Sequence, residues 1–330
     1  MTDMQIDVRS PGDTRPALLT RFITGAGLII LIYISLYAVY AAQQPKALSS
    51  HSIVALLNNT VPLALAAAGQ AIIVISRGFD LSVAGVISIT NVVLAVWPLE
   101  GPGGAAISVL ICLAIGITIG AVNGYLVAML RLQSIAATLA TMIICQGIAL
   151  VILKAPGGWV AEWISYEMTG RLVGVIPVSG LVLGVVLLVW IWIRRSAFGI
   201  SLYAIGADET SARLSGIDTT RIRFLAHVVA GCAYGLAGFM LSAQTATGNP
   251  TSGTPLLMLT FAAVALGGTS LSGGRGGVFV TMMGAATLTL LQKVLFSSGV
   301  SSFYTGMFQG VVLILAVVFS SFLVRLGDRK

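Results

Sequence analysis

Charged residues are scarce in this sequence, since only 9% of its 330 residues are Asp, Glu, Lys or Arg. A soluble domain carries about 25% charged residues, because its surface must face water. A globule of this size would lack the charge to stay in solution, so the composition excludes an ordinary soluble enzyme or binding domain. The hydrophobic share of 57% and the mean hydropathy of +0.99 instead indicate a membrane protein.

Cysteine and histidine are also rare, with three cysteines and two histidines in the chain. Cys112, Cys145 and Cys232 lie inside apolar segments without the spacing of metal ligands, so we expect them to be small buried hydrophobic residues. His51 and His227 are isolated residues near the expected helix ends. We therefore predict no metal site and no cofactor bound by this chain.

Nucleotide-binding and catalytic motifs are missing as well. No lysine is followed by Ser or Thr, so the phosphate-binding pattern G-x-x-x-x-G-K-[ST] does not occur. The apolar segments contain no Ser-His-Asp set and no paired carboxylates. We expect no enzyme, and a partner would have to bind any ATP and Mg²⁺ that drive its activity. The net charge of +7 is spread between apolar segments, as membrane topology predicts, and does not indicate nucleic-acid binding.

Long apolar segments dominate the chain, and a helix of about 20 apolar residues crosses a bilayer. The alternation over roughly 10 residues that marks a transmembrane barrel is absent. We predict an all-α, polytopic membrane helix bundle with about ten transmembrane helices, or eight as the alternative. The third and eighth segments are short and bounded by glycine-rich turns, so we expect either to be broken or re-entrant. The ten segments are 19–42, 52–76, 81–98, 104–130, 134–154, 178–193, 222–243, 257–272, 277–296 and 303–324.

Basic residues predict the orientation of this bundle, because cytoplasmic loops carry an excess of Lys and Arg. With ten spans and both termini in the cytoplasm, 14 of the 18 Lys and Arg residues lie inside. We expect one transmembrane domain over 19–324, a disordered cytoplasmic tail over 1–18 and a short cytoplasmic tail over 325–330. The basic residues left outside are Lys46, Lys154, Arg171 and Lys293.

The outside loops are too short to fold into a ligand-binding domain. They cover 43–51, 155–177 and 244–256. Capture of a scarce solute outside the cell must therefore fall to another protein.

Glycines recur every fourth residue in several apolar segments. Small residues at this spacing let helix backbones approach closely in lipid. They predict tight packing inside one subunit, or else a seam between two copies. The glycines are Gly116, Gly120, Gly124, Gly180, Gly184, Gly231 and Gly235.

The longest inside connection, 194–221, encodes a short helix. Asp208 is a good N-cap, Glu209 suits the positive end of the helix dipole, and Gly216 can take the left-handed conformation that ends the helix. A rigid helix between two spans suits a permease that receives force from a cytoplasmic ATPase, whereas a basic loop that only fixes topology is the alternative. The spacing leaves both readings open. The residues predicted to couple to the ATPase are Gly206, Asp208, Glu209, Arg213, Leu214, Ser215 and Gly216.

Three stretches resemble a known family of membrane proteins. FGISLYAIGADETSARLSGI at 198–217 is similar to the cytoplasmic loop of ribose-type sugar ABC permeases. ISRGFDLSVAG at 75–85 and AAVALGGTSLSGGRG at 262–276 are similar to two turns of the same family, and the likeness covers nearly all of 52–320. The chain departs from the family at Arg77, where a second glycine is usual, and at Ser134, which replaces a common proline.

The resemblance implies the transmembrane subunit of a binding-protein-dependent sugar importer in the bacterial inner membrane. Its implied partners are an ABC ATPase, a periplasmic sugar-binding protein, and either a second permease copy or a paralogous permease. The implied substrate is a monosaccharide like ribose or xylose, or a polyol, and the sequence does not choose among them. An ion-coupled carrier is the alternative, but such a carrier needs ionisable residues near the bilayer midplane, and the predicted span centres carry none.

The two resembling turns supply candidate gate or turn residues. Asp80 follows Gly78 and precedes an apolar helix, so its simplest role is an N-cap, and the alternative is a gate at the cytoplasmic mouth. The full set is Gly78, Asp80, Ser82, Gly268, Ser272 and Arg275.

Amide side chains inside or beside the apolar segments are the candidates for a sugar path. A buried amide is costly without a partner, so each either packs against another helix or lines water. Neutral hydrogen-bonding groups suit an uncharged polyol better than an ion. These residues are Asn58, Asn59, Gln70, Asn91, Asn123, Gln146 and Gln244.

Overall fold

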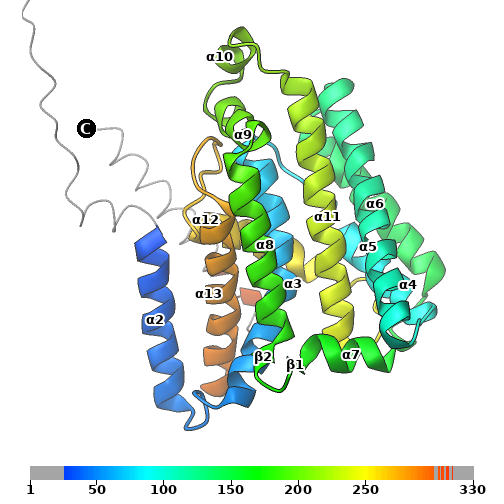
Figure 1. The fold of residues 1–330 in the computed structure, drawn as a ribbon, viewed down its shortest axis with the longest axis vertical. Helices are drawn as coiled ribbons and strands as arrows, with labels where there is room; N and C mark the ends of the chain where they lie inside the picture. Colours follow the sequence, from blue (N-terminus) through cyan, green and yellow to red (C-terminus); the bar gives the residue numbers. More distant parts are fainter. Residues whose placement is uncertain (1–25, 301–303, 305, 308–309, 312–313, 315–330) are drawn as a thin grey trace, which may run out of the picture.

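The computed structural model describes residues 26–300 and six further residues, 304, 306–307, 310–311 and 314. It is an all-α bundle, and seven of its helices are long and apolar enough to cross a membrane (Figure 1). They are α2 (Ala26–Gln43), α3 (Ser50–Ile75), α5 (Gly101–Gly124) with its π-helical continuation η1 (Tyr125–Met129), α6 (Ser134–Ile152), α8 (Val178–Arg195), α11 (Thr219–Thr245) and α13 (Val278–Ser297).

Shorter elements complete the bundle and mark its two ends. Helices α4 (Val83–Val96) and α12 (Thr254–Leu266) are packed among the long helices. Helices α9 (Ala197–Ala207) and α10 (Glu209–Leu214) lie at one end, called here the α10 end. Figure 1 places α7 (Glu162–Thr169) and the antiparallel hairpin of β1 (Arg171–Leu172) and β2 (Ile176–Pro177) at the opposite end, the α7 end.

The first nine predicted segments each contain a helix, which confirms the helical bundle. With 14 and 13 residues, α4 and α12 reach only about 20 Å, less than the roughly 30 Å of bilayer hydrocarbon. The eighth segment was predicted to reach 272, which is wrong, because α12 ends at Leu266. Two residues later Gly268 takes a left-handed conformation with a φ of 77°, which ends the helix.

Three sequence predictions fall outside the described part of the chain. The tenth segment, 303–324, lies almost wholly outside it, and so do the tails 1–18 and 325–330. The total of ten spans therefore stays a prediction.

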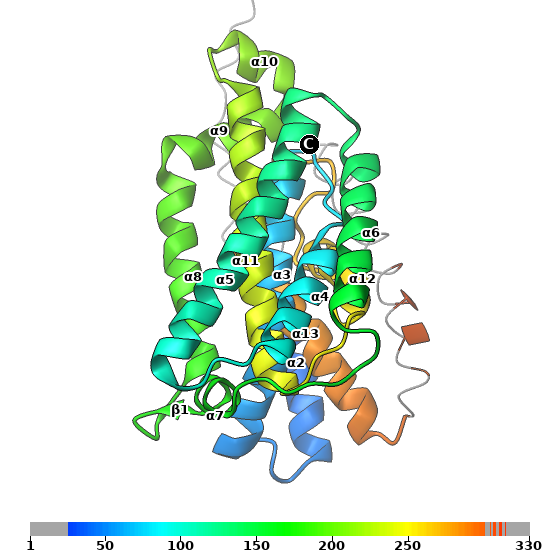
Figure 2. The ribbon, with the colours of Figure 1, turned by 90° about the vertical axis from the view of Figure 1, so that its right-hand side faces the viewer.

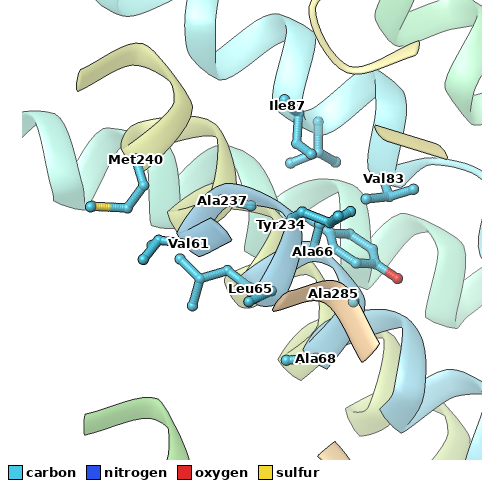
Figure 3. Close-up of a cluster of buried hydrophobic side chains, with 14 of the residues drawn as sticks. Val61, Leu65, Ala66, Ala68, Val83, Ile87, Tyr234, Ala237, Met240 and Ala285 are labelled. Atoms are coloured by element: carbon cyan, nitrogen blue, oxygen red, sulfur yellow. The ribbon is translucent and has the colours of Figure 1, made fainter. Parts of the chain in front are cut away.

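Helix α3 forms the centre of the bundle. All of its residues from Thr60 to Ile75 are buried, and α11, α13 and α12 pack around it. Figure 3 shows Leu65 of α3 among Ala237 and Met240 of α11. In the most apolar stretch of α3, 61% of the residues are buried within the chain, against 11% in α8, so α8 lies at the periphery of the bundle.

A close helix contact joins α5 and α11 through glycines. A methyl group on Gly116 would lie 2.1 Å from the carbonyl oxygen of Gly231, and one on Gly120 would lie 2.4 Å from that of His227. This confirms the predicted packing of these glycines inside one subunit. On α8, by contrast, a methyl group on Gly184 would meet no atom within 4 Å.

Replacing Gly116 by leucine is expected to disrupt the bundle. The added side chain would clash with backbone atoms, which cannot swing aside, and overpacking costs about 1–3 kcal/mol even where side chains can adjust. Size-exclusion chromatography and thermal unfolding in detergent should show aggregation or a lowered Tm. Gly184→Leu is the matched control, since that position is open, and equal stability of the two variants would contradict the described contact.

Candidate functional site

The connection between α8 and α11 holds two helices, where the sequence predicted one. The prediction was wrong about the stretch before Asp208, which forms α9. Ser196 caps this helix, because its hydroxyl accepts a hydrogen bond of 3.3 Å from the Gly199 N–H. The apolar composition of α9 hid it inside a segment interpreted as a loop.

Asp208 caps α10, as predicted. Its carboxylate accepts a hydrogen bond of 2.7 Å from the backbone N–H of Ser211. This bond, more than the positive charge of nearby Arg77, lowers the pKa of Asp208. Because the folded-state pKa lies below that of the unfolded chain, the cap stabilises α10 above the unfolded pKa. That contribution is lost as the pH falls through the lowered value.

Gly216 ends α10 in the left-handed conformation, also as predicted, with a φ of 84°. Its N–H donates to the Arg213 carbonyl over 3.0 Å. Two residues further on, Asp218 caps α11 by accepting from the Arg221 N–H at 3.0 Å. The segment is therefore held in a fixed shape at both helix boundaries.

Gly206, near the end of α9, packs directly on the last turn of α3. A methyl group there would lie 1.8 Å from the Ile75 carbonyl oxygen and 2.4 Å from the backbone nitrogen of Gly274. The same Ile75 carbonyl accepts a hydrogen bond of 2.9 Å from the Gly274 N–H. The backbones of α9, of the end of α3 and of the turn around Gly274 are therefore in direct contact.

Arg77 ties the same three segments together. Its Nη2 donates to the Ala207 carbonyl over 2.7 Å, and its Nε donates to the Ser272 carbonyl over 2.9 Å. Arg77 has a φ of 62°, in the region that favours glycine. This conformation explains why the resemblance implies a glycine here, and the two hydrogen bonds offset the strain in this chain.

The structure corrects the role of Asp80. The N-cap position of α4 belongs to Ser82, and Asp80 accepts from the Ser82 N–H at 2.9 Å and from its hydroxyl at 2.6 Å. Asn123 donates to the Ser82 hydroxyl over 2.8 Å and accepts from Thr141 over 2.7 Å. Asp80 and Asn123 are fully buried, so this chain of hydrogen bonds joins α4, α5 and α6 inside the bundle.

Hydroxyl groups on α6 hold the turn before α4, and this contact was not predicted from the sequence. Thr138 accepts a hydrogen bond from the Leu81 N–H at 3.0 Å, and Ser134 accepts one from the Phe79 N–H at 3.4 Å. Ser134, Thr138 and Thr141 are spaced four and three apart, which places them on one helix face. That spacing could have predicted the contact from the sequence.

The other resembling turn lies between α12 and α13. Gly268 and Ser272 are exposed there, and Gly273 packs against Arg77 and Gly206. The backbone carbonyl of Arg275 accepts a hydrogen bond of 3.1 Å from the Ser270 N–H. The two turns that hold the predicted gate or turn residues are therefore neighbours at the α10 end.

The chain between α11 and α12 enters the bundle without being helical. Beside the α7 end, Gly248 pairs with Gly157 through two hydrogen bonds. Further on, the Gly253 N–H donates to the Ser88 hydroxyl over 3.1 Å, and a methyl group on Gly253 would lie 2.0 Å from the Ala84 carbonyl oxygen. The stretch 246–253 therefore runs along α4 and leads directly into α12.

Asn91 and Gln146 bind this non-helical backbone. The Asn91 amide donates to the Thr247 carbonyl over 3.0 Å and accepts from the Asn249 N–H at 2.6 Å. Gln146 donates to the Pro250 carbonyl over 2.5 Å. Polar backbone within a membrane must find partners inside the protein, and these side chains supply them.

The remaining amides lie at separate places. Gln70 is fully buried and accepts from the Tyr234 hydroxyl at 3.2 Å, while Asn58 is half-buried and donates to the Thr169 carbonyl over 2.9 Å. Asn59 is exposed near the α7 end, where it accepts a hydrogen bond from Gln244. The structure therefore brings the seven amides to several sites and not to one continuous row.

Comparisons with known proteins place these features in context. Residues 52–317 match the family described as "Branched-chain amino acid transport system / permease component". The chain is 32% identical over 309 residues to the ribose import permease protein RbsC of Escherichia coli K12, covering 90% of this chain and 95% of the relative. It is 33% identical over 296 residues to RbsC of Bacillus subtilis strain 168, covering 88% and 90%.

A third relative carries a different sugar in its name. The fructose import permease protein FruF of Bifidobacterium longum is 29% identical over 272 residues, covering 81% of this chain and 76% of the relative. No solved structure matches the chain significantly.

Proposed function

The chain belongs to the permease family that matches residues 52–317, so it is a transport subunit and not an enzyme, and from that premise we propose that it carries a sugar into the bacterial cell as part of an ABC importer. The observation that carries this proposal is the 32% identity to a ribose import permease across 90% of the chain. A monosaccharide like ribose or xylose, or a polyol, is the proposed substrate class.

An ABC ATPase is the proposed energy source, docked at the α10 end. The contacts of Gly206 and Arg77 support this, because they connect α9 and α10 to the ends of α3 and α12 without a flexible linker. A push on α10 would reach the bundle through them. The coupling residues proposed are those of 194–221, from Gly206 to Gly216.

The distribution of basic residues supports a cytoplasmic α10 end. Four basic residues of the described chain lie towards the α7 end: Lys46, Lys154, Arg171 and Lys293. Eight lie towards the α10 end: Arg77, Arg131, Arg194, Arg195, Arg213, Arg221, Arg223 and Arg275. We extend this to the bacterial inner membrane, with both chain termini in the cytoplasm.

The α7 end would then receive the substrate. In the described part of the chain, its loops form α7 and a two-stranded hairpin and no other regular element, which is too little to enclose a sugar, so a periplasmic sugar-binding protein is proposed to deliver it. A second permease copy, or a paralogous permease, would complete the path.

Uptake assays test this function directly. The chain is expressed with the ATPase and binding protein encoded beside it, and uptake of labelled ribose, xylose, fructose and leucine is measured. We expect uptake of a sugar, loss of uptake when the ATPase cannot hydrolyse ATP, and no response to a protonophore.

Leucine serves as the discriminating solute, because the family description names branched-chain amino acids. Leucine uptake without sugar uptake would reject the sugar. Uptake that persists without the ATPase and collapses with the protonophore would reject the ABC importer in favour of an ion-coupled carrier.

A further inference from the structure

A cavity of about 420 Å³ lies at the α10 end, and no role assigned so far uses it. It is bounded by α10, the first turns of α11, the connection between α5 and α6, and the turn before α4. Figure 2 shows α10, the start of α11 and the α5–α6 connection at this same end. Four arginines line the cavity, Arg77, Arg131, Arg213 and Arg223, and we call it the arginine pocket.

The arginine pocket carries excess positive charge. Glu209 is the single carboxylate that lines it, and it pairs with Arg223 at 2.8 Å and with Arg213 at 3.7 Å. Arg77 is bonded to uncharged carbonyl groups, and the Arg131 side chain makes no hydrogen bond or ion pair with the described residues. Asp208 is near Arg77 but fully exposed, outside the lining. Four guanidinium groups against one carboxylate favour an anion.

Two buried atoms of the lining have no partner in the described chain. They are Nε of Arg223 and Nε2 of His227, whose side chain is only 2% exposed. Buried polar atoms are normally hydrogen-bonded, so each points to an occupant that supplies the missing bond.

The ring orientation of His227 narrows the chemistry of that occupant. Its Nδ1 lies 2.9 Å from the Arg223 carbonyl oxygen, which can only accept, so Nδ1 carries a proton. In the neutral ring Nε2 is then an acceptor. The occupant must therefore offer anionic oxygens to the arginines and an O–H to His227, and a phosphate monoester carries both, as P–O⁻ and P–OH.

The N-terminus of α6 and the hydroxyl groups at the start of α11 add to this preference. Ser134 is the first residue of α6, and Thr219 and Thr220 are the first two of α11, and all three line the cavity. Helix N-termini attract phosphate through their N–H groups and dipoles, and the hydroxyls add further donors.

We propose that the arginine pocket binds a phosphate monoester and that its occupancy fixes α10 against the membrane helices. The volume falls in the range of about 300–1,000 Å³ typical of small-molecule sites, so it holds a phosphate on a body the size of a sugar. Free sugar phosphate and phosphatidate share this chemistry. That the pocket faces the cytoplasm rests on the proposed function.

Direct binding measurements test the site without transport. The purified full chain, in nanodiscs of phosphatidylcholine, is titrated with ribose 5-phosphate, inorganic phosphate and sulfate by calorimetry. We expect ribose 5-phosphate to bind, phosphate to compete with it, and sulfate to compete at least tenfold less well, because sulfate offers no proton to His227.

Variants connect the binding to this cavity. Arg131→Gln and Arg223→Gln should each weaken ribose 5-phosphate binding at least tenfold. Arg221→Gln is the matched control, since Arg221 is on the same helix as Arg223 but does not line the cavity, and its affinity should stay within twofold of wild type. Arg131→Gln is the variant least prone to misfold, because the Arg131 side chain has no hydrogen-bond or ion-pair partner to lose among the described residues.

The outcomes separate the alternatives. One outcome is that free phosphates do not bind, that nanodiscs containing phosphatidate stabilise the protein, and that Arg131→Gln loses this stabilisation. That result would assign the site to the lipid form of the same monoester. Another outcome is that neither free phosphates nor phosphatidate bind and that the pocket is covered only when the ATPase is docked. That result would overturn the proposal and identify the pocket as part of a docking surface. Phosphate binding by a chain that fails to import sugar would count against the proposed function alone.

Discussion

A Gly206→Val variant is expected to lose at least about nine-tenths of ATP-driven sugar uptake while still inserting into the membrane, since a tenfold change needs only about 1.4 kcal/mol. The reason is steric. A methyl group on Gly206 would already lie 1.8 Å from the Ile75 carbonyl oxygen, so valine must push α9 away from the end of α3. The coupling segment would stay attached to its flanking helices but lose its contact with the bundle.

Uptake and ATPase activity, measured in the same proteoliposomes, check this expectation. An uncoupled transporter should keep ATP hydrolysis and lose its stimulation by the sugar-loaded binding protein. Gly184→Val, at a position with no atom within 4 Å, controls for the effect of valine in a membrane helix. Normal uptake by Gly206→Val would show that force does not pass through this contact.

Replacing Asn91 by leucine is expected to destabilise the fold by about 1–3 kcal/mol, the usual cost of a polar group left without its hydrogen-bond partner inside a protein. The change removes the partner of the Asn249 N–H and one of the two donors to the Thr247 carbonyl, which keeps the Thr245 hydroxyl. It also removes the donor to the Ser242 hydroxyl, at 3.0 Å. Leucine has the same number and branching of side-chain heavy atoms as asparagine, so the change removes hydrogen bonds without leaving a cavity.

Thermal unfolding in nanodiscs measures this loss as a lower Tm. Asn59→Leu is the control, because Asn59 is an amide on an exposed part of α3, and its Tm should change little. Equal Tm values for the two variants would mean that the stretch 246–253 does not depend on the Asn91 side chain.

Local signals in the sequence predicted much of this fold. Apolar length located nine helices, and the caps at Asp208 and Gly216 were readable because each cap depends on atoms a few residues away. The helix α9 was missed because its apolar residues follow α8 after a single cap, Ser196, which the sequence analysis did not recognise.

The arrangement of the site depends on contacts between distant segments, which periodicity does not encode. Arg77 meets Ala207 and Ser272 across gaps of 130 and 195 residues, and nothing near Arg77 in the sequence names those partners. The arginine pocket was not predicted for the same reason, because its basic residues were interpreted one at a time as topology signals. The amides were predicted either to pack against another helix or to line water, and the sequence did not name the partners of Asn91, which lie 151 and 156 residues away.

The glycine contact between α5 and α11 has a mechanical consequence. Side chains between two helices can change rotamers and let the helices slide, but Gly116 and Gly231 bring backbone against backbone, with nothing between them to rearrange. The two helices must therefore turn and tilt together as one rigid pair. Only residues 215–218 separate α10 from α11, so a displacement of α10 would move this pair as a unit.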